Sequence, residues 1–147
     1  MPQGLKRFHQ SGQSHFVTFS CYHRRPNLTG PEPCRIFLEA LEAARKRFAI
    51  RIYGYVLMPE HVHLLLSEPT PVTLAEAIHF VKSSSGKRLC CEETKAFWQP
   101  RYYDRNIRDY HEFVVKLRYL HRNPVKRGLC LSPEQWPWKQ LPALSNG

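Results

Sequence analysis

The chain has 147 residues, 42% of them hydrophobic, which suits one domain with a real core and excludes wholesale disorder. It contains no long uninterrupted apolar run, and residues 1–10 lack an apolar signal segment, so we expect no membrane span and a cytoplasmic location. Lys and Arg total 22 against 12 Asp and Glu, for a net charge of +10. The simplest partner for such a charge is a polyanion, with nucleic acid ahead of membrane.

The five cysteines are an odd number and show no CxxC spacing. They are Cys21, Cys34, Cys90, Cys91 and Cys130. This usage favours reduced, mostly buried thiols over disulfides or a zinc clip.

The first half of the chain predicts three strands and a helix. Alternating apolar residues predict a strand at His15–Cys21, and apolar residues at helical spacing predict a helix at Glu32–Phe48. Two further strands follow at Ile50–Met58 and His61–Ser67. The short break between them, Pro59-Glu60, makes these two strands an antiparallel hairpin, and we expect Glu60 to be a turn residue more readily than a metal ligand.

The second half predicts two helices around an extended segment. A helix from Thr73 to about Cys91 is weakened in its middle by Ser83–Gly86, and an extended segment follows at Phe97–Ile107. The last helix covers Asp109–Arg122, where we expect Asn123-Pro124 to end it. From about residue 131 the proline-rich tail should be irregular, docked by Trp136 or Trp138.

The order of these elements is strand, helix, strand, strand, helix, strand, helix. It predicts an α+β fold of the ferredoxin-like, split βαβ type, with an additional C-terminal helix. We expect a single domain, in which an antiparallel sheet has its helices packed on one face.

His61 and His63 are the first candidate site residues. They alternate along one strand, so their rings share a face, with Cα atoms about 6.5–7 Å apart, and can converge on one divalent ion. Val62 and Leu64 then point into the core on the other face. Two surface histidines on a half-exposed strand would give the same spacing, so the pattern alone leaves both interpretations open.

Tyr119 is the second candidate, because it lies off the apolar stripe of the last predicted helix. Asn123 is one turn further on the same face. The phenol could supply an oxygen nucleophile, and the amide oxygen a third metal ligand. A partly exposed tyrosine packed on Val115, with Asn123 as a helix cap, is the alternative.

Basic residues crowd this segment and could hold a phosphate backbone near Tyr119, with nearby aromatic rings to stack on the bases of a single strand. They are Arg101, Arg105, Arg108, Arg118, Arg122, Lys126 and Arg127. Each one alone is an ordinary surface charge.

Three blocks together carry a resemblance to a known family. They are YGYVLMPEHVHLLL (residues 53–66), FWQPRYYDRNI (97–107) and LRYLHRNPVKRGL (117–129). Their order and spacing resemble the HUH-type single-tyrosine transposases, in particular the REP-associated tyrosine transposases of bacteria. The resemblance covers the chain from the first strand to Leu129; Glu60 stands where such proteins often have a small polar residue.

The resemblance implies a DNA nickase and strand transferase that acts on single strands near hairpins. It implies a divalent ion, Mg²⁺ or Mn²⁺, held by His61, His63 and Asn123, and a covalent 5′-phosphotyrosine intermediate on Tyr119. Monomers and homodimers are both compatible with it.

Two other functions remain open on the sequence alone. One is a module that binds hairpin nucleic acid without cutting it. The other is a metal-dependent phosphodiesterase that uses water as its nucleophile. A covalent tyrosine adduct distinguishes all three.

Overall fold

The fold is built on a five-stranded antiparallel sheet with the strand order β4-β1-β3-β2-β5. In this computed structural model, residues 14–89 and 96–141 are described. The strands are β1 (Ser14–Ser20), β2 (Ile52–Leu57), β3 (His61–Ser67), β4 (Tyr103–Ile107) and β5 (Lys139–Gln140). The order of the first four strands confirms the predicted ferredoxin-like, α+β arrangement.

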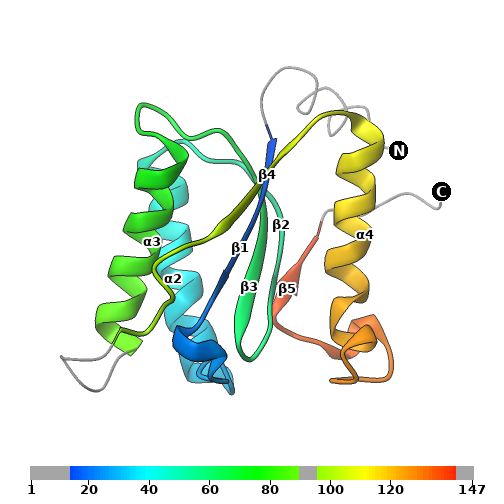
Figure 1. Cartoon of the computed structure of the whole chain (residues 1–147). Coiled ribbons are helices and arrows are strands. Elements are labelled where there is room, and N and C mark those ends of the chain that lie inside the picture. Colours follow the sequence, from blue (N-terminus) through cyan, green and yellow to red (C-terminus); the bar gives the residue numbers. More distant parts are fainter. Residues whose placement is uncertain (1–13, 90–95, 142–147) are drawn as a thin grey trace.

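Helices cover both faces of this sheet (Figure 1). The helices α2 (Pro31–Arg47) and α3 (Leu74–Leu89) pack on one face, and α4 (Tyr110–Lys126) packs on the other. The expectation of helices on a single face therefore holds for α2 and α3 and is wrong for α4.

The strands themselves explain why both faces are covered. Phe16 and Leu65 are buried in the cluster beneath α4, whereas Val17 and Leu64 are buried in the cluster beneath α2 and α3. Strands with apolar side chains on both sides give the sheet two hydrophobic faces. A layer of helix on each face is needed to bury them.

The α3 helix runs straight through the segment that was predicted to weaken it. The hydroxyls of Ser84 and Ser85 donate hydrogen bonds to the carbonyls of Phe80 and Val81, one turn earlier. The Trp98 indole in turn donates to the Ser85 hydroxyl over 3.0 Å. These bonds satisfy the serine hydroxyls inside the packed layer, and the segment is helical throughout.

The segment before β4 is less regular than predicted. Only Tyr103–Ile107 pairs as a strand with β1, while Trp98 makes one isolated bridge to Cys21. Phe97 and Trp98 are buried against the α2–α3 layer, so their burial, and not strand pairing, accounts for the apolar pattern.

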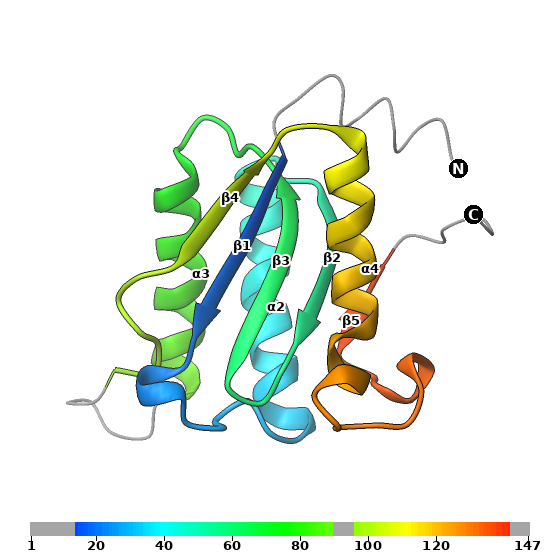
Figure 2. The same ribbon diagram turned by 45° about the vertical axis from the view of Figure 1, so that its right-hand side comes forward.

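The C-terminal tail is more ordered than predicted. It forms a 3₁₀ turn, Pro133–Gln135, and the short strand β5, which pairs with β2 beside α4 (Figure 2). The Trp136 indole donates a 2.9 Å hydrogen bond to the Leu57 carbonyl, which confirms the predicted docking by this residue. Residues 142–147 lie outside the described part.

The described cysteines fit the expectation of reduced thiols. Cys21 and Cys34 are buried and unpaired, and burial raises the pKa of each thiol to about 11. Cys130 is half-buried and unpaired, while Cys90 and Cys91 lie outside the described residues. Within residues 14–89 and 96–141, no helix combines the length and apolarity needed to cross a membrane.

Candidate active site

The two histidines share one face of β3, as the strand periodicity predicted. Their Nε2 atoms lie 3.0 Å apart, and their ring centroids lie 4.6 Å apart. Both residues are buried beneath the α4 layer, at 5% and 6% exposure, so they are not ordinary surface histidines. Val62 and Leu64 point the other way, into the core beneath α2 and α3.

Each histidine has a partner at its other ring nitrogen. The Thr18 hydroxyl of β1 lies 2.7 Å from Nδ1 of His63, and a carboxylate oxygen of Glu60 lies 3.0 Å from Nδ1 of His61. The two Nε2 atoms are thereby left facing each other.

Burial also fixes the charge of the pair. Desolvation, together with the neighbouring His61 and Lys116, lowers the pKa of His63 to about 3. Desolvation likewise lowers the pKa of His61. Both imidazoles are therefore neutral at neutral pH, which is the form that binds a cation.

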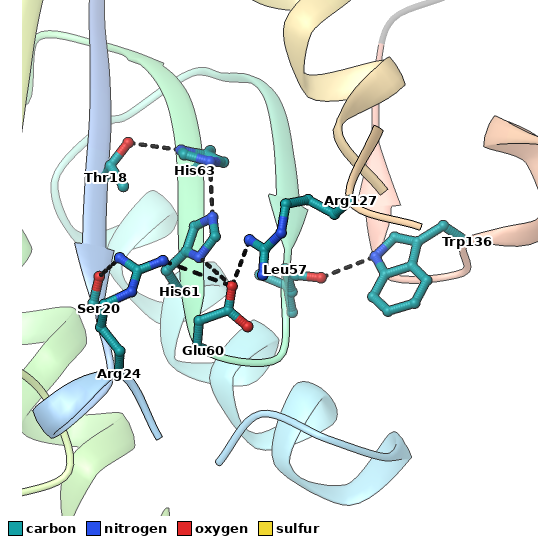
Figure 3. A network of polar contacts seen from close by, with 9 residues as sticks. All are labelled: Thr18, Ser20, Arg24, Leu57, Glu60, His61, His63, Arg127 and Trp136. Carbon is teal, nitrogen blue, oxygen red and sulfur yellow. Dashed lines mark hydrogen bonds and ion pairs between the residues drawn. The ribbon is translucent and has the colours of Figure 1, made fainter. Parts of the chain in front are cut away.

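Glu60 lies inside the site, although a turn residue was the favoured interpretation of its position and a metal ligand the alternative. The residue is 9% exposed, and its Oε1 atom lies 2.6 Å from a guanidinium nitrogen of Arg127 and 3.8 Å from one of Arg24 (Figure 3). Burial works to raise the pKa of this carboxyl, but the ion pair with Arg127 and the charge of Arg24 outweigh it, so the pKa is lowered.

The helix that carries Tyr119 begins at a well-formed cap. The Asp109 carboxylate accepts the backbone N–H of Glu112 over 2.8 Å, which satisfies one of the unpaired N–H groups at the helix start. Tyr119 is 42% exposed, as expected for a position off the core stripe. Its ring packs edge-on against His63, with 5.3 Å between centroids, and against Phe16, with 5.9 Å.

The prediction that Asn123-Pro124 ends this helix is wrong. The helix continues to Lys126, and the N–H groups of Arg127 and Leu129 bond to the carbonyls of Asn123 and Pro124. Proline removes its own N–H bond from a helix and its ring crowds the carbonyl of the preceding turn; here Pro124 is buried, which offsets that cost. Gly128 follows the end of the helix in the left-handed conformation, at φ +75°, as glycines that terminate helices commonly do.

The longer helix buries Asn123, which is 4% exposed and whose Nδ2 atom has no hydrogen-bond partner. Tyr119 lies one turn before Asn123 and contacts His63, and Arg127 lies one turn after it and contacts Glu60. Because residues four apart share a helix face, Asn123 lies on the same face of α4 as Tyr119 and Arg127, the side that packs on the sheet.

The seven predicted DNA-binding residues divide into two groups. Arg105 pairs with Glu112 over 2.9 Å, and Arg127 pairs with Glu60, so both guanidiniums have internal partners. The other five, Arg101, Arg108, Arg118, Arg122 and Lys126, are exposed. Lys116 was not predicted; its Nζ lies 4.8 Å from the centre of the Phe16 ring, which also packs against Tyr119.

The residues present fit a divalent cation. Two nitrogens that bind one ion at about 2.1 Å, at right angles, lie about 3 Å apart, which matches the 3.0 Å between the Nε2 atoms. In residues 14–89 and 96–141, no group of three His, Cys, Asp or Glu side chains is arranged to hold a metal. The third ligand suggested by the sequence, Asn123, is buried on the face of α4 that also carries Tyr119.

Fold and site define a transposase of the IS200-like family, to which the chain belongs. The model of that family matches residues 9–123, and its members are tyrosine transposases, enzymes that act on DNA. Among individual relatives, a REP-associated tyrosine transposase of Escherichia coli K12 is 23% identical over 133 residues, covering 90% of this chain and 79% of the relative.

A solved structure shares the fold. It is that of a REP-associated tyrosine transposase bound to a REP hairpin, with a TM-score of 0.76 and 22% sequence identity over 87% of this chain and 76% of that one.

Proposed function

We propose that this transposase is a metal-dependent endonuclease and strand transferase that nicks single-stranded DNA near hairpins. His61, His63 and Asn123 hold a divalent cation, Mg²⁺ or Mn²⁺, and Tyr119 is the nucleophile. The observation that supports this most directly is a buried, neutral histidine pair against which the ring of an exposed tyrosine packs.

A divalent cation held at this pair would polarise the scissile phosphate. The Tyr119 oxygen then attacks phosphorus, the bond to the 3′ oxygen breaks, and the 5′ end of the cut strand stays on the tyrosine. The phenol loses one proton and the departing 3′ oxygen gains one. Because one phosphodiester replaces another, a second 3′-hydroxyl can reverse the step and join strands without ATP.

Hairpin DNA is the proposed substrate for two reasons. The net charge of +10 and the exposed basic residues of the α4 segment suit a phosphate backbone. A relative of the same fold is solved with a REP hairpin bound.

The test is a covalent adduct. A single-stranded oligonucleotide that contains a hairpin is incubated with the protein and Mn²⁺, and the products are separated on a denaturing gel. We expect Tyr119→Phe to lose both the adduct and the nick, because it removes the hydroxyl and keeps the ring. Tyr103→Phe, at the more exposed Tyr103 (55%), is the matched control and should react normally.

An adduct that persists in Tyr119→Phe would exclude Tyr119 as the nucleophile. Binding of the hairpin without any cutting would favour a binding module. Cutting without an adduct would favour water as the nucleophile.

A further inference from the structure

The buried carboxylate of Glu60 contacts both halves of the candidate site. We propose that Glu60 is a positioning residue: it fixes the tautomer of His61 and, through Arg127, locks the helix of Tyr119 and Asn123 against the histidine pair. The consequence for metal binding rests on the proposed function, whereas the tautomer and the helix contact do not.

The contacts of His61 place Glu60 outside the gap between the Nε2 atoms. Nδ1 of His61 faces Glu60 over 3.0 Å, and Nε2 faces His63 over 3.0 Å. These two nitrogens lie on different sides of the ring, so Glu60 is not placed to share an ion with the Nε2 atoms. A carboxylate in this position orients a ligand instead of serving as one.

The chemistry of the contact sets the tautomer. Nδ1 of His61 and Oε1 of Glu60 do not meet the geometry of a hydrogen bond, but an ionised carboxylate 3.0 Å away attracts an N–H and repels a lone pair, so the proton of neutral His61 belongs on Nδ1 and the lone pair on Nε2. In the metal-free protein the remaining contacts then form one consistent chain. Nε2–H of His63 donates to Nε2 of His61, and the Thr18 hydroxyl donates to Nδ1 of His63.

The same carboxylate holds the end of α4. Arg127 directly follows the helix, its backbone N–H bonds to the Asn123 carbonyl over 2.9 Å, and its guanidinium lies 2.6 Å from Glu60 (Figure 3). Tyr119 and Asn123 lie on the two turns before this contact. One side chain therefore sets the orientation of a histidine on β3 and the position of the helix that faces it.

The test compares two variants and a matched control. Glu60→Met removes the acceptor at similar length, and Glu60→Gln keeps an acceptor oxygen. Glu112→Gln removes another carboxylate of the α4 region that pairs with an arginine, at the opposite end of the helix. Circular dichroism checks that each variant is folded.

The first readout is the long-range ¹H–¹⁵N spectrum of the metal-free protein at neutral pH. We expect His61 to carry its proton on Nδ1 in the wild type, in Glu60→Gln and in Glu112→Gln, and to lose this preference in Glu60→Met. A wild-type spectrum with the His61 proton on Nε2 would overturn the proposal without any variant.

The second readout is the dissociation constant for Mn²⁺, measured by titration. Loss of such an outer partner costs 10–100-fold in metal affinity, which we expect for Glu60→Met, with a smaller loss for Glu60→Gln and none for Glu112→Gln. A folded Glu60→Met with unchanged tautomer and affinity would refute the positioning role. A wild type that binds no Mn²⁺ would refute the proposed metal site, while the tautomer would still decide the role of Glu60.

Discussion

At the scale of single residues, the His61–His63 pair combines burial with neutrality. Water is excluded from both imidazoles, and the pKa of His63 is lowered to about 3 as a result. A charged imidazole at this position would lack solvation, so the fold itself selects the neutral form.

The lowered pKa of His63 makes the stability of the metal-free protein depend on pH. Because the pKa of His63 falls from 6.5 to about 3 on folding, the unfolded chain takes up the proton first, and stability is lost as the pH falls through that window. Between pH 7 and pH 5 we expect His63 to account for a loss of about 2 kcal/mol.

Urea unfolding in EDTA at both pH values measures this loss, with His63→Leu as the comparison. The variant should lose less stability than the wild type on acidification. Equal losses in the two proteins would show that His63 does not titrate in this window.

Sequence periodicity was sufficient to place His61 and His63 on one face, because alternation along a strand is a local rule. It could not reveal that Glu60 joins them. Its contacts with Arg24 and Arg127 bring distant parts of the chain together, and only the packed sheet and helix place them there.

At the scale of elements, the sequence predicted each major helix and the strands β1, β2 and β3 from their apolar periods, and it predicted an extended segment that contains β4. It failed at the end of α4 and at β5. Pro124 is a strong helix breaker by local rules, and its burial overrides them. β5 has two residues, too few for any period, and exists because β2 offers it a free edge.

Gly54 of β2 lies where the segment around β5 packs closely against β2, so this packing depends on a small residue. A Cβ atom there would lie 2.8 Å from Leu141 Cδ2, 3.2 Å from Leu120 Cδ1 and 3.3 Å from the Gln140 carbonyl. We expect Gly54→Ala to lower the free energy of unfolding by about 1–3 kcal/mol, the usual cost of overpacking.

Gly86→Ala is the control, because its Cβ would meet only ordinary contacts from 3.5 Å outward inside α3. There we expect no loss, or a gain of up to about 1 kcal/mol from helix propensity. Urea denaturation measures the free energy of unfolding of both variants. An unchanged value for Gly54→Ala would show that the C-terminal segment moves aside without loss of stability.

At the scale of the whole molecule, the sheet keeps two helices on one face and gives the other to α4 and the candidate site (Figure 1). The excess of positive charge is a property of the entire chain. Under the proposed function, this charge would supply affinity for a phosphate backbone, and the residues around His61 and Tyr119 would supply the chemistry.

The salt dependence of the affinity for DNA tests whether the exposed cations of α4 contact the phosphate backbone. Each phosphate contact to a single strand contributes about 0.7 to the slope of log affinity against log salt, so Arg122→Gln with Lys126→Gln should reduce the slope by about 1.4. Arg35→Gln, on α2 and already paired with Glu32 and Glu39, is the control and should leave it unchanged. An equal slope in the double variant and the wild type would place the DNA elsewhere.

The most direct measurement of the central claim is the identity of the residue that carries the DNA. The adduct formed with a hairpin-bearing single strand and Mn²⁺ is digested with protease and nuclease, and the modified peptide is sequenced by mass spectrometry. We expect a nucleotide linked through its 5′ phosphate to Tyr119. A nucleotide on Tyr22 or Tyr103, the other two exposed tyrosines, would contradict the assignment of Tyr119 as the nucleophile.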